Sequence, residues 1–138
     1  MRITKTMKEV IEKRLYAKEQ EADDAARAGY RARKNSCADE LRAMISECRA
    51  KVNDVLVEYG MDTIDYDYMD RPSGNAADSI FRFDDSHIHN NAERKELDAA
   101  SRQRHTKMKD AVEEIIFDAE AGGNKESLLA AIAAVTFD

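Results

Sequence analysis

The feature that most constrains this chain is a stretch without proline that runs from residue 6 to residue 59. The single proline of the chain, Pro72, lies beyond it. Large apolar side chains recur at spacings of three and four residues through its second half, which is the period of an amphipathic helix. The sequence therefore predicts long helical structure over these residues. The apolar positions are Cys37, Leu41, Met44, Ile45, Cys48, Val52, Val55, Leu56 and Tyr59.

The first half of this stretch carries a second apolar series that is out of phase with the first. At 100° per residue the two stripes differ by roughly 100°, so one straight helix cannot turn both toward one partner. Asn35 can adopt the left-handed conformation of a helix end, and Ser36 can open a capping box. We expect a break or sharp kink near residues 34–36, between a basic helical segment, 1–34, and a core helix, 36–60. The alternative is one very long helix.

Residues 63–83 change to a two-residue period, which is typical of a half-buried β-strand. Residues 70–75 have the composition of a turn, and residues 80–83 resemble a return strand. An isolated hairpin is marginally stable, so its apolar face must cover a helix or another subunit. The sequence predicts an acidic β-hairpin here. Its apolar positions are Ile64, Tyr66 and Tyr68 with Phe81 and Phe83.

Two more helices are predicted after the hairpin. Residues 91–121 have helical periodicity and end before Gly122. Asn124 can cap a short C-terminal helix within residues 124–136.

These elements predict an α+β protein that is predominantly α, as a single domain over residues 1–138. Long antiparallel helices with coiled-coil-like packing carry one β-hairpin insertion and a short C-terminal helix. The apolar stripes of residues 37–59 and 97–119 are expected to form the core or the seam of a dimer.

Composition narrows the location of the protein. No apolar run approaches the roughly 18 residues that span a membrane, and residues 1–15 lack the apolar region of a signal peptide. We predict a cytoplasmic protein that does not bind membranes. Cys37 and Cys48 share a helix face about 16 Å apart, too far for a disulfide within the chain. We expect buried thiols, with an intermolecular disulfide or a metal site as the alternatives.

Motifs for cofactors and common catalytic sites are absent from the sequence. There is no Gly-rich phosphate loop, Cys-x-x-Cys pair, His-Glu-x-x-His helix or nucleophile elbow. His87 and His89 are the best metal candidates, but a zinc site needs a third ligand held in place, and His105 is far along the next helix. We therefore predict a non-enzymatic protein with no metal and no cofactor.

A metal-dependent helical hydrolase is the alternative from the enzyme class. Glu9-x-x-Glu12 with Glu21-x-x-Asp24 invites comparison with the helical nucleotide pyrophosphatases, which hold magnesium between such motifs. In those enzymes the acids come from separate helices, whereas nothing in this sequence separates residues 9 and 24. The comparison is therefore not favoured.

Acidic side chains gather in and around the predicted hairpin. Massed like charge adds little stability to a small fold, so we interpret it as a docking surface for a protein partner with a basic surface. In its sharpest form the surface imitates nucleic-acid phosphates and inhibits a nucleic-acid-handling enzyme, in the manner of phage-encoded inhibitors. Solubility and protection of a strand edge are the plainer alternative. The residues are Asp62, Asp65, Asp67, Asp70, Asp84 and Asp85.

Residues 1–34 are rich in Lys and Arg, and three of their basic side chains follow one helical face: Arg27, Arg31 and Lys34. Such a row could follow nucleic-acid phosphates. Acids interrupt it, and the chain has a net charge of −6 and a pI near 5.2, so nucleic acid is possible but not favoured. The basic face could instead pair with the acidic surface of a second copy. The sequence thus predicts a homo-oligomer, most simply a dimer.

Overall fold

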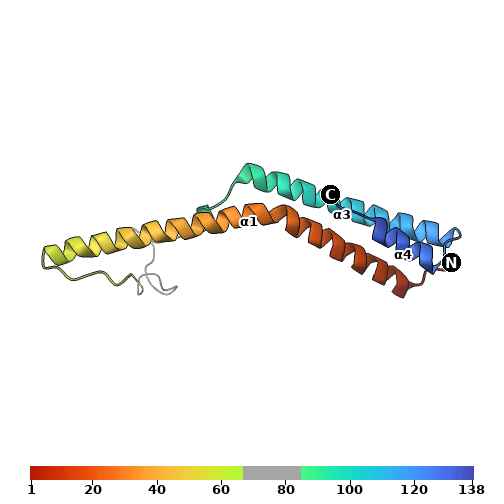
Figure 1. Ribbon diagram of the computed structural model, residues 1–138, viewed down its shortest axis with the longest axis horizontal. Coiled ribbons are helices and arrows are strands. Elements are labelled where there is room, and N and C mark those ends of the chain that lie inside the picture. The colour runs from red at the N-terminus through yellow and green to blue at the C-terminus, as the bar shows by residue number, and fades with distance from the viewer. Residues whose placement is uncertain (67–84) are drawn as a thin grey trace. The chain divides into compact units, whose positions relative to one another are not determined.

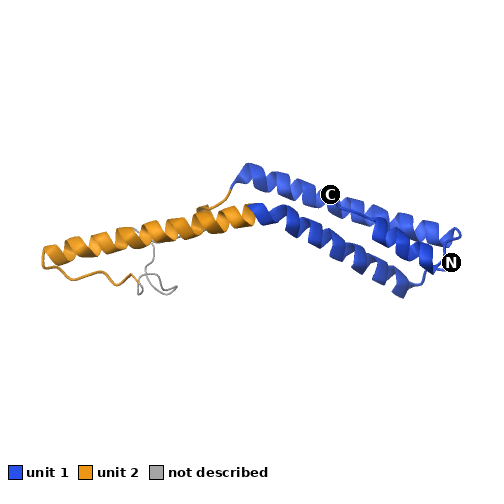
Figure 2. Cartoon of the chain, in the orientation of Figure 1, with its two compact units in different colours: residues 1–29, 90–138 blue, residues 30–89 orange. Residues whose placement is uncertain are grey.

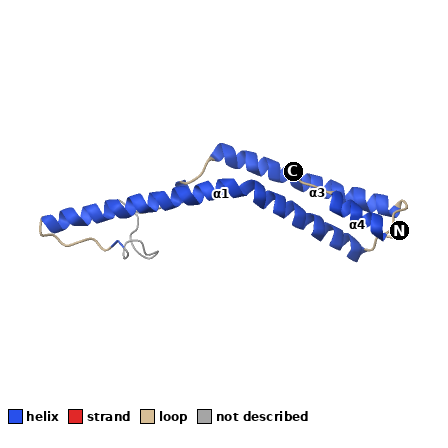
Figure 3. Cartoon of the chain, viewed as in Figure 1, coloured by secondary structure: helices blue, strands red, loops and turns tan. Residues whose placement is uncertain are grey.

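The computed structural model of the protein describes residues 1–66 and 85–138, and these residues are built from helices (Figures 1 and 3). The elements are α1 (Lys5–Glu58), the short 3-10 helix η2 (Asp85–His87), α3 (Asn91–Glu120) and α4 (Lys125–Ala134). The chain divides into two compact units (Figure 2). The first unit holds residues 1–29 and 90–138, and the second holds residues 30–89.

The first unit has an apolar core to which all three of its helices contribute. Ile11 and Leu15 come from α1, and Phe137 follows α4. The remaining members confirm the core role of the 97–119 stripe: Met108, Val112, Ile115 and Ala119 from α3, with Leu128 and Ile132 from α4. The ammonium group of Lys18 closes the end of α4, since Nζ donates to the carbonyl oxygens of Ile132 and Ala133, each at 3.0 Å.

The predicted beginnings of the two later helices are confirmed. Asn90 caps α3, where its side chain accepts a hydrogen bond from the backbone N–H of Glu93 at 3.1 Å. Asn124 caps α4 through a capping box in which Ser127 N–H donates to Asn124 Oδ1 at 2.8 Å. In return, Asn124 N–H donates to Ser127 Oγ at 2.9 Å. These bonds satisfy backbone donors that have no partner within a helix.

The predicted interruption near residues 34–36 is wrong, because α1 continues through them as one helix of 54 residues. Residues 30–59 contain neither proline nor glycine, and Asn or Ser inside a helix costs only about 0.7 kcal/mol or less relative to alanine. The two out-of-phase stripes belong to different units, whose boundary lies between Gly29 and Tyr30.

The predicted α+β class with a β-hairpin is also wrong: the protein is predominantly α, and the described residues contain no strand. Helix α1 ends at Glu58, and Gly60, two residues further on, has a positive φ of 71°. Gly60 N–H donates to Val57 O at 3.0 Å, and Met61 N–H donates to Leu56 O at 2.8 Å. This pair of bonds is the Schellman motif, which terminates helices where the chain reverses direction.

After this reversal, the backbone of Ile64 forms its hydrogen bonds with the side chain of Asn53. The alternating pattern had predicted that a partner strand would form them. Asn53 Oδ1 accepts a hydrogen bond from Ile64 N–H at 2.8 Å, and Asn53 Nδ2 donates to Ile64 O at 3.2 Å. Both backbone groups that Ile64 would offer to a β-ladder are therefore satisfied from α1. The predicted return strand, residues 80–83, lies outside the described residues.

Candidate functional site

Most of the large apolar side chains that are exposed on α1 in the second unit lie along one side of the helix, whereas Val57, which is 62% exposed, lies on the opposite side. The exposed fraction is 56% for Met44, 53% for Val55 and 72% for Tyr59, which follows the end of the helix. At 100° per residue these positions fall within an arc of about 60°. We call this side of the helix the apolar face. Its members are Cys37, Leu41, Met44, Cys48, Val55 and Tyr59.

The neighbouring side of the same helix is covered by the chain that follows it. Ile64 is held by Asn53, as described above, and the guanidinium carbon of Arg49 lies 4.7 Å from the centre of the Tyr66 ring. Ile45, Val52 and Leu56 on this side are half-buried, and Ala38 is buried. The returning segment therefore covers one part of the apolar stripe and leaves the apolar face exposed.

The 37–59 stripe was expected to form the core or the seam of a dimer; within the chain it is covered only on one side, and the dimer seam stays a prediction. The prediction of buried thiols is wrong, because Cys37 and Cys48 are both exposed. An apolar stripe in the sequence shows which residues are apolar. How far those residues are buried depends on how much of the chain packs against them.

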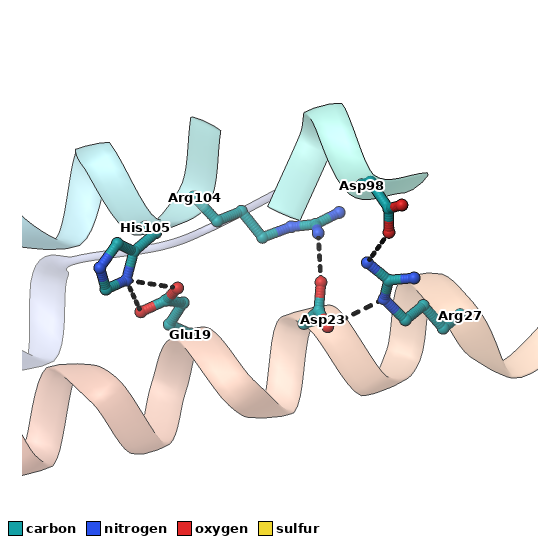
Figure 4. A network of polar contacts seen from close by, with 6 residues as sticks. All are labelled: Glu19, Asp23, Arg27, Asp98, Arg104 and His105. Atoms are coloured by element: carbon teal, nitrogen blue, oxygen red, sulfur yellow. Dashed lines mark hydrogen bonds and ion pairs between the residues drawn. The ribbon is translucent and has the colours of Figure 1, made fainter. Parts of the chain in front are cut away.

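In the first unit a row of ionic contacts joins α1 to α3 (Figure 4). The carboxylate of Glu19 is buried, and its Oε1 lies 3.1 Å from His105 Nδ1. Asp23 Oδ1 accepts from Arg104 Nη1 at 3.0 Å. Residue numbers rise along α1 as they fall along α3, so the contacts hold the two helices antiparallel.

Arg27 completes this row on α1. Its Nη2 donates to Asp98 Oδ1 at 2.9 Å, and its Nε donates to Asp23 Oδ2 at 3.0 Å. Asp23 therefore lies between Arg27 and Arg104, and both of its oxygens are used. Partly buried carboxylates that are paired in this way resist displacement of one helix along the other.

The surroundings of Asp23 favour its charged form. Burial disfavours the carboxylate, but hydrogen bonds from Ser101 and Arg27 and the charges of Arg27 and Arg104 outweigh it and lower the pKa of Asp23 below its ordinary 3.8. The hydrogen bond to Asp98 is the largest influence on Arg27. With the contribution of Asp23 it raises the pKa of this guanidinium against the opposing effect of burial.

The lowered pKa of Asp23 predicts acid sensitivity of the first unit. Because the folded-state pKa lies below the unfolded value, the carboxylate contributes stability above about pH 4 that is lost as the pH falls through the folded pKa. We expect the free energy of unfolding to fall more steeply below about pH 4 in the wild type than in Asp23→Asn. Urea unfolding across a pH series measures this difference, and parallel curves for the two proteins would contradict it.

Arg27, the first residue of the predicted basic face, is committed to the ionic row between α1 and α3. The other two, Arg31 and Lys34, are exposed in the second unit. This division removes one of the three cations that a phosphate-binding row would need.

The predicted acidic surface is described only in part. Asp62 and Asp65 follow the end of α1 and are exposed. Asp85 opens η2. The other three residues, Asp67, Asp70 and Asp84, lie outside the described residues.

Metal-binding groups do not gather in the part of the chain that the structure describes, where no set of three ligating side chains occurs. His89 Nδ1 lies 3.1 Å from the carbonyl oxygen of Ser86, and His87 ends η2. Glu9, Glu12, Glu21 and Asp24 all lie on α1, so the two acidic motifs come from one helix. Among the described helices, none combines the length and the apolar character needed to cross a bilayer.

A groove of about 550 Å³ lies in the first unit between the start of α1 and α3. Met108 and Val112 contribute apolar surface to it. Its charged side chains mix both signs, so the groove selects neither an anion nor a cation. These are Lys8, Glu9, Glu12, Lys13, Lys109 and Glu113.

The sequence predicts the pair of Asp23 with Arg27 from their i,i+4 spacing, but the contacts of the ionic row between α1 and α3 were not predicted, although a signal for one of them exists. Glu19 follows Ile11 and Leu15 at four-residue spacing, on the side of α1 that enters the core. An acid at a core position is unfavourable unless it is paired, so it predicts a partner on the facing helix. Comparison with protein-family models, with curated proteins and with solved structures gives no match for this chain.

Proposed function

We propose that this protein is a non-enzymatic protein-binding module whose docking surface is the apolar face of α1. The supporting observation is that large apolar side chains are exposed together on one arc of the helix, and no charged side chain falls within that arc between residues 37 and 59. Contiguous exposed apolar surface marks interaction sites, and depletion of charge is typical of the centre of a protein interface.

The N-terminal part of the helix that carries the apolar face is packed into a folded core. Ile11 and Leu15 of α1 are buried in the core of the first unit. A docking helix that is already folded loses less conformational entropy on binding than a disordered segment, which favours affinity. This arrangement supports a binding role.

Acidic residues beside the apolar face indicate which kind of partner would bind there. Asp62 and Asp65 follow the face directly in the chain, which favours a partner with basic groups. The seam predicted for a dimer, residues 37–59, includes this apolar face. A cytoplasmic location fits two exposed free thiols, since reducing compartments preserve them. Inhibition of an enzyme by this protein stays a prediction from the sequence.

Two glutamates placed on the apolar face test the proposal. We expect Leu41→Glu/Met44→Glu to abolish association of the full chain with itself and with proteins captured from a cell extract, because charge is excluded from the centre of an interface. The matched control, Ala43→Glu/Ala50→Glu, adds the same charge to exposed alanines on the opposite side of α1 and should keep all associations. Light scattering and affinity capture measure both. Identical masses and identical captured proteins for the three chains would overturn the proposal.

A further inference from the structure

We infer that the partner at the apolar face is a second copy of this chain, packed antiparallel along α1 with a two-fold axis at Cys48. This inference rests on the proposed function and names the partner of the same surface. Three properties of the chain between residues 31 and 62, most of which lies in α1, support it: the symmetry of the apolar positions, their period and the distribution of charge.

The positions of the apolar face, together with Val52 at its edge, are symmetric about Cys48. Counting outward, Met44 and Val52 lie four residues away, Leu41 and Val55 seven, and Cys37 and Tyr59 eleven. A two-fold axis perpendicular to two antiparallel helices brings together residues at equal distances on either side of it. Each large side chain of the face therefore meets an apolar side chain of the second copy, and Cys48 meets itself. Val52, which is half-buried, lies at the edge of the face.

The period of the face lets two helices stay in contact along its whole length. Cys37, Cys48 and Tyr59 are separated by eleven residues each, as are Leu41 and Val52, and Met44 and Val55. Eleven residues make three turns of 3.67 residues, close to the 3.6 of an α-helix, so the face drifts only slightly around the axis and favours a gentle right-handed pairing. The contact runs for about 33 Å.

Charge decides the direction of the pairing. Arg31, Arg33 and Lys34 stand before the face, whereas Asp54, Glu58 and Asp62 stand at its other end. Antiparallel packing sets the basic end of each copy against the acidic end of the other. Parallel packing would set like charges together at both ends, and such juxtaposition is strongly unfavourable at interfaces. An unrelated partner gives no reason for the symmetric spacing.

Cysteine cross-linking of the full chain tests the axis directly. In Cys37→Ser the remaining thiols, at Cys48, meet at the two-fold axis, so a short bismaleimide should convert most of the protein to covalent dimer. In Cys48→Ser the two Cys37 thiols lie about 33 Å apart across the pair and should stay unlinked. Both thiols are exposed, so the reagent can reach either one. Equal cross-linking of the two variants would show parallel packing and overturn the inference.

Reversal of the charge at one end of the apolar face tests the antiparallel direction of packing in a second experiment. Arg33→Glu/Lys34→Glu makes both ends acidic, and Glu58→Lys/Asp62→Lys makes both ends basic. Each variant alone should dimerise at least about tenfold more weakly than the wild type, and a mixture of the two should recover wild-type affinity as a heterodimer. Sedimentation velocity measures all three. Unchanged dimerisation of each variant alone would contradict the antiparallel arrangement.

The outcomes separate this inference from the proposed function. If the wild type stays monomeric at high concentration, yet Leu41→Glu/Met44→Glu loses a captured protein that the control variant keeps, the second copy is the wrong partner and the protein-binding role stands. If the wild type is monomeric and the face substitutions change nothing, both fail.

Discussion

Replacement of Leu15 by alanine is expected to lower the free energy of unfolding by about 2–5 kcal/mol, the range for removing a buried leucine side chain. Leu15 is 0% exposed and lies in the core that α1, α3 and α4 build together. The loss combines the transfer energy of the removed methyl groups with the cavity that the helices cannot close. Urea unfolding followed by circular dichroism measures it.

Leu129 provides the matched control for this substitution. It lies on α4 and is 42% exposed, so Leu129→Ala removes the same atoms with a much smaller loss. Both variants are unfolded at several protein concentrations, because association of the folded chain adds to its apparent stability. Equal losses for the two variants would show that Leu15 does not occupy the centre of the core.

Replacement of Asp23 by alanine is expected to destabilise the first unit by about 1–3 kcal/mol, the range for leaving a buried hydrogen-bonding group without its partner. The substitution removes the carboxylate that lies between Arg27 and Arg104, whose side chains are both mostly buried. Arg27 keeps its contact with Asp98, whereas Arg104 loses its bond at 3.0 Å. The same unfolding experiment measures the loss.

An exposed ion pair in the second unit gives the control for Asp23. Asp39 lies 3.4 Å from Arg42, and its side chain is 80% exposed. Surface pairs of this kind contribute little, so Asp39→Ala should leave stability unchanged. A double-mutant cycle of Asp23 with Arg104 should show an interaction of at least about 0.5 kcal/mol. Additive losses would argue against a direct contribution of this contact.

Local signals predicted the later helices well. Asn124 and the glycines before it set the start of α4, since a helix cap is made by residues within one turn of each other. The start of α3 at Asn91 is a local matter of the same kind. The alternation from Thr63 to Tyr66 led to the wrong prediction of a β-strand. A two-residue period does not specify which group will form hydrogen bonds with the backbone. That bond comes from Asn53, eleven residues earlier.

The candidate site was only partly accessible to sequence reasoning. The apolar stripe and the shared side of Cys37 and Cys48 follow from helical periodicity. Which part of the stripe stays exposed depends on the reversal at Gly60 and on the segment that Asn53 holds. The predicted acidic surface relied on a hairpin that the described residues do not form.

The sequence by itself determined that this chain builds long helices, where the last two begin, and that one side of α1 is apolar from residue 37 to residue 59. These properties depend on neighbours within a few residues. Only the tertiary structure decided that Glu19 and Asp23 bind α3 and that Met44 and Val55 remain in contact with solvent. Such outcomes depend on which distant segment packs against each side of a helix. The periodicity of the sequence does not specify that segment.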